Sequence, residues 1–308
     1  MARTLSGIPP AYLLFAACSF WGGATVLNKA LLTTISPVLL LLIQLLASAI
    51  MLGAAVTWLK KALPRGRTLV AAIALGVLNP GISYTFSLMG LERISASVTS
   101  LLWATEPFLI LGLAWFVLRE PITARVVATI AVGFAGVVFV SGLFSDQSTG
   151  QTDMLGIGLL FAAVLMCAIY TVFSRKLGDA VDSLSLVAVQ QTAGLVWAAV
   201  LFAATTGQDA PAVIAAVPPP ELVYAAISGL LYFAAAYWLY LSALSRVSAA
   251  LAGGSFNVIP LVTIAMAFVF LGERLSGMQA LGATLILLSA GALLWLTRGP
   301  ATTQGEHT

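Results

Sequence analysis

The segment Leu91-Glu92-Arg93-Ile94-Ser95-Ala96-Ser97 returns 153 residues later as Leu244-Ser245-Arg246-Val247-Ser248-Ala249-Ala250. Pro107, thirteen residues before Glu120, returns at the same offset as Pro260, thirteen residues before Glu273. Tyr84 and Tyr237 fall on the same register. The chain therefore contains one unit twice, and a repeat this long predicts a duplicated folding unit.

The composition of the chain places that unit in a membrane. Of its 308 residues, 60% are hydrophobic and 8% are charged, and the mean hydropathy is +1.05. Soluble domains do not reach these values. Stretches long enough to cross a hydrocarbon core of roughly 30 Å recur between short polar breaks. We expect an all-α integral membrane protein with ten transmembrane helices, at 11–31, 37–59, 69–89, 95–118, 123–142, 154–174, 182–206, 221–243, 249–271 and 276–297.

The span count fixes how the two copies are oriented. Residues 1–148 and 149–308 each contain five predicted spans. An odd number of spans per copy makes the copies enter the membrane in opposite directions. Two inverted five-helix repeats around a central cavity are the plan of many secondary transporters, which rock one half against the other.

The distribution of Lys and Arg predicts the orientation of the whole protein, because cationic loops stay in the cytoplasm. Of the fourteen such residues, only Lys29, Arg93 and Arg274 fall on one side. We therefore expect both termini in the cytoplasm. The net charge of +3 follows from this asymmetry and does not indicate nucleic-acid binding. The remaining eleven are Arg3, Lys60, Lys61, Arg65, Arg67, Arg119, Arg125, Arg175, Lys176, Arg246 and Arg298.

Two paired elements resemble a known family. They run from Pro107 to Leu118-Arg119-Glu120-Pro121-Ile122-Thr123 and from Pro260 to Leu271-Gly272-Glu273-Arg274-Leu275-Ser276. With the ten spans and the duplicated unit, they make nearly the whole chain resemble the EamA family of the drug/metabolite transporter superfamily. The resemblance implies a multi-pass transporter of small molecules in a bacterial inner membrane, without a cofactor. A monomer in the lipid bilayer is the assembly we expect.

Three further elements narrow the resemblance. They are Trp21-Gly22, Asn79-Pro80-Gly81 and Trp103-Ala104-Thr105-Glu106-Pro107. Together they are similar to the bacterial amino-acid exporters associated with aromatic substrates. The second copy departs from this pattern, so we expect an asymmetric binding site. Trp103, Ala104 and Glu106 are replaced there by Phe256, Asn257 and Ile259.

Glu106 lies at the centre of the fourth predicted span, where an ionised carboxylate costs about 2.5 to 3.5 kcal/mol. No other span offers Lys or Arg at a comparable depth. The carboxyl is therefore protonated, faces a watery cavity or meets a cationic group of the substrate. A carboxyl bonded to a neighbouring helix beside a kink is the structural alternative, and the residues leave both open.

Prolines inside three spans favour a central cavity. Pro80, Pro107 and Pro260 each remove an intrahelical hydrogen bond and free the carbonyl four residues earlier. Freed carbonyls in lipid must be bonded inside the bundle, although a packing kink would need no ligand.

Aromatic and amide side chains complete the predicted site. Thr99, Trp103 and Glu106 have the spacing of one helix face. Aromatic walls with a few polar groups suit an amphipathic solute. Interfacial belts explain other aromatic residues, such as Trp58 and Trp295, and contacts between helices would equally explain the glutamines. The predicted substrate-binding residues are Trp21, Gln44, Asn79, Tyr84, Trp103, Glu106, Gln190, Tyr237 and Asn257.

The closing glutamates are interpreted as fold determinants. Glu120 and Glu273 directly precede the fifth and tenth spans, where the positive end of a helix favours a carboxylate. Thr123 and Ser276 are suitable N-caps, and Ser276 with Gln279 has the spacing of a capping box.

Other functions are disfavoured by the sequence. No GxxxxGK[ST] element is present, and the single histidine, His307, lies in the tail. Cys18 and Cys167 fall inside spans, which predicts apolar packing and no disulfide framework. An enzyme acting on lipid-linked substrates would need converging acids and bases, whereas Glu106 is the lone central acid. We expect export of an amino acid or another small amphipathic metabolite or drug, either uncoupled or coupled to a proton on Glu106.

Overall fold

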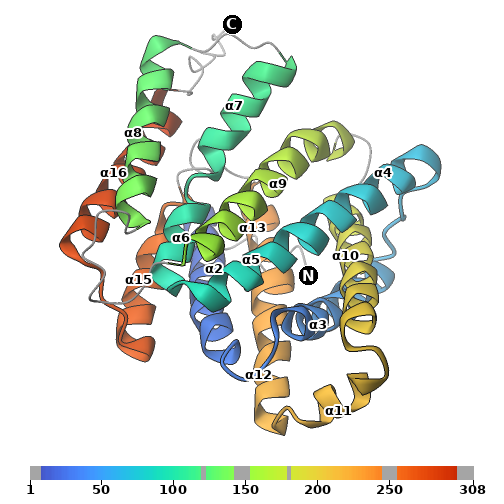
Figure 1. Cartoon of the computed structure of the whole chain (residues 1–308). Helices are drawn as coiled ribbons and strands as arrows, with labels where there is room; N and C mark the ends of the chain where they lie inside the picture. Colours follow the sequence, from blue (N-terminus) through green and yellow to red (C-terminus); the bar gives the residue numbers. More distant parts are fainter. Residues whose placement is uncertain (1–7, 119–122, 142–152, 179–181, 245–254, 297–308) are drawn as a thin grey trace, which may run out of the picture.

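A computed structural model describes residues 8–118, 123–141, 153–178, 182–244 and 255–296. These residues form helices and contain no strand (Figure 1). The first copy contributes α2 (Pro10–Leu31), α3 (Pro37–Trp58), α4 (Gly66–Gly76), η1 (Val77–Ile82), α5 (Ser83–Arg93), α6 (Ala96–Trp103), α7 (Glu106–Leu118) and α8 (Ala124–Val140). The second contributes α9 (Met154–Gly178), α10 (Ser183–Thr206), η3 (Gly207–Asp209), α11 (Ala210–Ala215), α12 (Pro219–Gly229), η4 (Leu230–Ala235), α13 (Ala236–Leu244), α15 (Val258–Leu271) and α16 (Gly277–Leu296).

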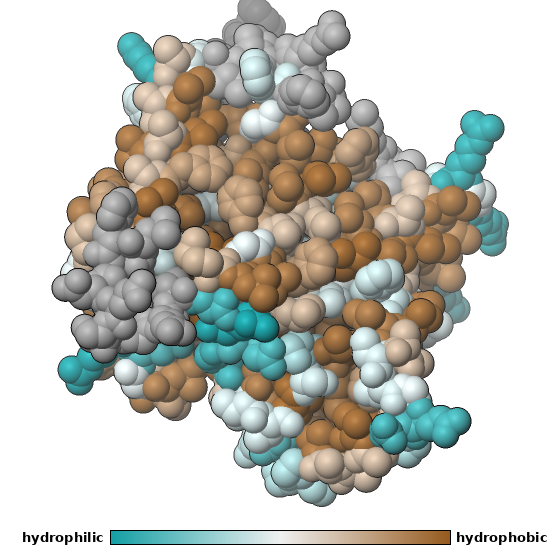
Figure 2. Space-filling model, in the orientation of Figure 1, coloured by the Kyte–Doolittle hydropathy of each residue, from teal (hydrophilic) through white to brown (hydrophobic). Residues whose placement is uncertain are grey.

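The described helices confirm an all-α membrane architecture. Seven helical stretches are long and apolar enough to cross a membrane. They are Pro10–Leu31, Pro37–Trp58, Gly66–Arg93, Ala96–Leu113, Met154–Ser174, Ser183–Ala215 and Pro219–Tyr240. Three shorter apolar helices, Ala124–Val140, Val258–Leu271 and Gly277–Leu293, lie at the other predicted positions. Hydrophobic side chains also cover broad areas of the face shown in Figure 2.

The two copies contact each other reciprocally through one pair of glycines. A Cβ atom on Gly76, at the end of α4, would lie 2.3 Å from the backbone oxygen of Gln190 in α10. A Cβ atom on Gly229, at the end of α12, would lie 2.4 Å from the backbone oxygen of Gln44 in α3. Gly229 follows Gly76 by 153 residues. Each copy thus packs a glycine against a glutamine backbone of the other copy.

Equivalent helices of the two copies run antiparallel where they meet. The end of α3 faces the start of α10, because Lys61 Nζ lies 2.7 Å from Asp182 Oδ2. Likewise, Val126 near the start of α8 shares a core cluster with Leu293 near the end of α16. These two helices pack side by side along their length (Figure 1).

Both copies also contain a π-helical segment at the same place. Val77–Ile82 forms η1 and Leu230–Ala235 forms η4, and their first residues are 153 apart. In η1 the backbone of Asn79 leaves the helical region, with φ −146° and ψ 116°, next to Pro80. No proline accompanies η4.

The fourth predicted span is broken where a kink was expected at Pro107. Helix α6 ends at Trp103 and α7 begins at Glu106, since Pro107 has no N–H with which to continue the helical bonding. Thr99 and Trp103 therefore lie in α6 and Glu106 lies in α7, so the shared face of one continuous helix stays a prediction. Glu106 is the first residue of a new helix and lies in its first turn.

Candidate functional site

Two small hollows lie inside the bundle, on opposite sides of its middle. We define the Lys61 end as the end with the Lys61–Asp182 ion pair, and the Arg93 end as the one where Arg93 Nη1 lies 2.7 Å from Asp153 Oδ2. The first hollow lies toward the Lys61 end. It is lined by Asn79, Pro80, Tyr170, Val187, Gln190, Gln191, Phe233 and Tyr237.

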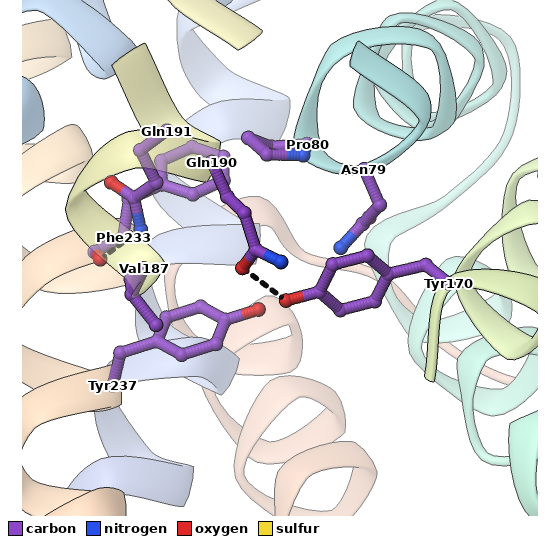
Figure 3. Close-up of a pocket in the computed structure, with 8 residues that line it drawn as sticks. All are labelled: Asn79, Pro80, Tyr170, Val187, Gln190, Gln191, Phe233 and Tyr237. Carbon is purple, nitrogen blue, oxygen red and sulfur yellow. Dashed lines mark hydrogen bonds between the residues drawn. The ribbon is translucent and has the colours of Figure 1, made fainter. Parts of the chain in front are cut away.

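Polar groups from four helical segments point into the first hollow. Figure 3 shows the side chains of Asn79, Tyr170, Gln190 and Tyr237 converging on one space. Tyr170 donates its hydroxyl to Gln190 Oε1 at 2.8 Å. Gln190 Nε2 donates to Ser174 Oγ at 3.4 Å. The space encloses about 10 Å³, which is room for about one water molecule.

The second hollow lies toward the Arg93 end and has a comparable size, about 10 Å³. Its polar lining comes mainly from hydroxyl and amide groups. The lining residues are Thr25, Asn28, Gln44, Tyr84, Ser87, Leu88, Leu91, Thr99, Trp103, Tyr232 and Phe233. Neither hollow has room for an amino acid in this conformation; the two hollows together are called the pathway below.

An aromatic cluster lines the second hollow and reaches the first through Phe233. Tyr84 stacks on Trp103 with ring centroids 5.6 Å apart. It also meets Tyr232 and Phe233 edge-on, at 5.5 Å and 4.9 Å. Phe233 is common to the linings of both hollows.

Glu106 lies beside this pathway at the start of α7. The residue as a whole is half-buried, and Thr171 Oγ1 donates to Glu106 Oε1 at 3.2 Å. The positive end of α7 adds a favourable interaction for a carboxylate. The backbone break therefore offsets part of the burial cost that a continuous helix would impose. Glu106 itself lines neither hollow.

Three buried polar atoms in the hollows lack a hydrogen-bond partner within the described residues. They are Gln44 Oε1 and Thr99 Oγ1 in the second hollow and Asn79 Oδ1 in the first. An unpaired buried acceptor costs about 1 to 3 kcal/mol. These atoms are therefore available to a polar group that enters the pathway.

Gln44 contributes to a buried hydrogen-bonded triad between the copies. Its Nε2 donates to Asn28 Oδ1 at 2.7 Å and to Ser228 Oγ at 3.0 Å. Ser228 also donates to Asn28 Oδ1. The triad joins α2, α3 and α12. Hydrogen bonds between helices thus explain how the Gln44 side-chain amide is accommodated inside a membrane bundle.

Side chains also bond the free carbonyls of η4. Trp21 Nε1 donates to the Tyr232 carbonyl at 3.0 Å, and Gln191 Nε2 donates to the Phe233 carbonyl at 2.6 Å. Trp21 also contacts Tyr237 edge-on, with ring centroids 5.4 Å apart. Trp21 therefore holds the wall of the pathway and lines neither hollow.

The structure brings most of the predicted site residues together. Asn79, Gln190 and Tyr237 line the first hollow, and Gln44, Tyr84 and Trp103 line the second. Trp21 and Glu106 lie immediately behind these linings. Asn257 is the residue before α15, is half-buried, and lines neither hollow.

Sequence reasoning missed several residues of the site. Asn28 and Ser228 complete the triad with Gln44, and Phe233 lines both hollows. A polar residue inside an apolar span was a usable signal for Asn28. Phe233 carries no such signal, because an aromatic residue in a membrane helix is ordinary.

The closing glutamate of the second copy does not act where it was predicted to act. Glu273 Oε1 accepts from the backbone N–H of Ala96 at 2.8 Å, so it serves the start of α6 in the first copy. The start of α16 is capped by Ser276 and Gln279 alone, at 3.2 Å and 3.0 Å, which confirms the capping box. Thr123 caps α8 as predicted, and Glu120 lies outside the described residues.

Within the described ranges, no group of three or more His, Cys, Asp or Glu side chains could hold a metal ion. Cys18 and Cys167 are both buried and free. The site therefore consists of aromatic rings, amides, hydroxyls and one carboxyl inside a membrane bundle. Such a lining defines the class of protein as a membrane transporter of small molecules once its relatives are considered.

The chain belongs to the EamA-like transporter family, part of the drug/metabolite transporter superfamily. The model of that family matches residues 9–142 and again residues 154–295. An uncharacterized transporter of Archaeoglobus fulgidus is 29% identical over 54% of this chain and 57% of its own length. The uncharacterized transporter YvbV of Bacillus subtilis is 28% identical over 61% of this chain and 60% of its own. The chain thus spans about three fifths of the length of these two relatives.

Two matches extend over most of the chain. The protein PecM of Dickeya dadantii is 23% identical over 89% of this chain and 88% of its own length. A protein of solved crystal structure matches with a TM-score of 0.61 and 20% identity, over 93% of this chain and 96% of that one. The latter match shows a shared fold.

Proposed function

We propose that this protein exports an amino acid, aromatic or otherwise neutral, by alternating access across a bacterial inner membrane. The observation that carries the proposal is the divided pathway, with aromatic walls, unpaired acceptors and the Glu106 carboxyl beside it. Aromatic walls suit an apolar side chain, and the acceptors and carboxyl suit an ammonium group.

The proposed architecture is ten membrane spans in two inverted five-helix repeats, divided near residue 148, with both termini in the cytoplasm. The antiparallel pairing of α3 with α10 and of α8 with α16 supports the inversion. The reciprocal contacts of Gly76 and Gly229 support equivalent positions in the two copies. Two opposed halves around one pathway can open it alternately at either end.

In this proposal the Glu106 carboxyl binds the substrate amine or carries a coupling proton. Thr171, which donates to this carboxyl, belongs to α9 of the second copy, so the carboxyl lies where the two copies meet. A change in its charge therefore acts on a contact between the halves. Movement down the substrate gradient needs no coupling residue, and proton coupling through Glu106 is the alternative.

Flux into liposomes tests the function directly. Purified protein is reconstituted, and uptake of labelled aromatic, neutral and charged amino acids is measured with and without a pH gradient. We expect saturable uptake of aromatic or neutral amino acids. Absence of uptake across the panel, with uptake of other amphipathic metabolites, would replace the substrate class. Absence of both would overturn transport.

The Glu106→Gln variant tests the role of the carboxyl. We expect at least a tenfold loss of flux, or loss of its dependence on the pH gradient, at unchanged expression. Glu221→Gln, at the start of α12 and away from both hollows, is the matched control and should retain wild-type flux. Unchanged flux in Glu106→Gln would return Glu106 to a structural role.

A further inference from the structure

The turn between α5 and α6 is held by two oppositely charged side chains from outside it. Lys29 Nζ, from α2, donates to the carbonyls of Leu91 and Glu92 at 2.9 Å and 3.0 Å, near the end of α5. Glu273, which follows α15, accepts from the start of α6. Each helix end thus meets the charge that its dipole favours.

The Glu273 contact is complete in hydrogen-bonding terms. Oε1 accepts from Ala96 N at 2.8 Å, and Oε2 accepts from Ser97 N at 3.0 Å and Ser97 Oγ at 2.7 Å. The next backbone N–H of this turn, that of Val98, donates to Ser95 Oγ at 3.1 Å. Of these three backbone N–H groups in the first turn of α6, two therefore donate to Glu273, a residue of the other copy.

Local structure places Glu273 for this contact. Gly272 ends α15 with φ +68°, in the left-handed region that favours glycine. The N–H groups of Gly272 and Glu273 then both return to the carbonyl of Ala267, that of Glu273 at 3.1 Å. This turn ends α15 and leads the chain to the N-terminus of α6.

The contact lies at the Arg93 end of the pathway. Thr99, one turn after Ser95, and Trp103, a turn further, line the second hollow, so α6 forms part of its wall. Helix α15 packs against both α6 and α2, and α2 lines the same hollow with Thr25 and Asn28. The packing of α6 against α15 therefore lies between this hollow and the Arg93 end.

We infer that Glu273 is a latch that closes the Arg93 end of the pathway by fastening α6 of the first copy to α15 of the second. The inference rests on the proposed alternating access. It adds that the carboxylate favours the conformation closed at this end. Release of its charge-assisted bonds must accompany opening.

Cysteine labelling measures directly whether the Arg93 end of the pathway is open, and it needs no substrate. In a Cys18→Ser, Cys167→Ser background, Leu88→Cys reports on the second hollow and Val187→Cys reports on the first. Purified protein in micelles is treated with a charged maleimide. We expect Glu273→Gln to raise the labelling rate of Leu88→Cys roughly tenfold and to lower that of Val187→Cys, because opening one end closes the other.

Two further variants keep the test decisive. Ser97→Ala removes one of the three bonds and should raise the Leu88→Cys rate by roughly threefold, even if Glu273→Gln fails to fold. Gln279→Ala removes the capping box of α16 near the same end and should change neither rate. Unchanged rates in Glu273→Gln and Ser97→Ala, or a parallel rise at both reporters, would overturn the latch. Failure of the transport proposal would appear separately, as absent flux in the wild-type protein.

Discussion

The two copies of the repeated unit contain the same distortion, built from different residues. In the first copy, η1 follows Gly76 and includes Pro80, with Asn79 outside helical geometry. In the second, η4 follows Gly229 and contains no proline, and Trp21 and Gln191 bond its carbonyls. The position of the wide turn is therefore set by what both copies share, which is the glycine packed on a glutamine backbone. The residues that accommodate the wide turn differ between the two copies.

The largest effect is expected when the glycines that the two copies share are replaced. In Gly76→Ala and Gly229→Ala, the new Cβ would lie 2.3 Å and 2.4 Å from backbone oxygens, which a rotamer change cannot relieve. We expect each variant to lose at least about 3 kcal/mol, at the upper end of overpacking costs, or to fail to fold. Thermal and denaturant unfolding in micelles measure the loss.

Gly53→Ala is the matched control for these two variants. Gly53 lies in α3, and a Cβ atom there would meet nothing within 4 Å. We expect this variant to be as stable as the wild type or slightly more so, because alanine favours a helix. A large loss in Gly76→Ala with none in Gly229→Ala would break the equivalence of the two copies.

A smaller effect is expected where the copies differ. Gln191→Leu leaves the Phe233 carbonyl of η4 without its donor and removes the acceptor of Ser48 Oγ. The expected loss is about 1 to 2 kcal/mol, the cost of an unpaired buried group. Because η1 does not depend on this amide, the same variant should leave contacts around Asn79 unchanged. Hydrogen exchange of the two segments would show which one loosens.

Thr192→Val is the control for Gln191→Leu. The Thr192 hydroxyl donates to the Ala188 carbonyl of its own helix at 2.8 Å, so its removal leaves no buried group unpaired. We expect almost no change in stability or exchange. Equal loosening of η1 and η4 in Gln191→Leu would show that the two segments form one cooperative unit.

The comparison also explains which features the sequence could predict. The period of the repeat and the register of its residues can be read directly from the sequence. The repeat offset, the span positions and the break at Pro107 could therefore be predicted. The distortion at η1 has a local signal in Pro80. The distortion at η4 has none, since its donors Trp21 and Gln191 lie 211 and 42 residues away. Contacts between distant segments leave no periodic pattern in one sequence.

The same reasoning applies to the site. Amides and aromatic residues in apolar spans predicted Asn79, Tyr84 and Gln190, because lipid penalises polar groups that do not face inward. The partner of Glu273 was predicted wrongly for a physical reason. A carboxylate before a helix favours the nearest helix end in sequence, whereas the turn at Gly272 carries it to α6. Local rules assign a charge to a helix end, and tertiary structure decides which one.

The smallest expected effect concerns the ion pairs that join the copies at the two ends. Asp153 and Asp182 each cap their own helix and pair with a cation of the first copy, Arg93 and Lys61. The hydrogen bond from Arg93, followed by the backbone N–H of Gly156, lowers the pKa of Asp153. A lowered pKa in the folded state means that the contribution to stability is present above the unfolded pKa, about 3.9 for Asp. It is lost as the pH falls through the lower, folded-state pKa.

Asp153→Asn tests that charge, because asparagine keeps an acceptor for the helix N–H groups and loses the ion pair. We expect Tm to fall by about 2 °C or less at pH 7, since the pair is solvent-exposed. The difference from wild type should shrink as the pH falls below about 4, where the carboxyl of the unfolded chain takes up its proton, and should vanish below the lower folded-state pKa. Asp182→Asn is the matched variant at the other end. A difference between Asp153→Asn and wild type that stayed constant down to pH 2 would show that the carboxylate charge contributes nothing at this joint between the copies.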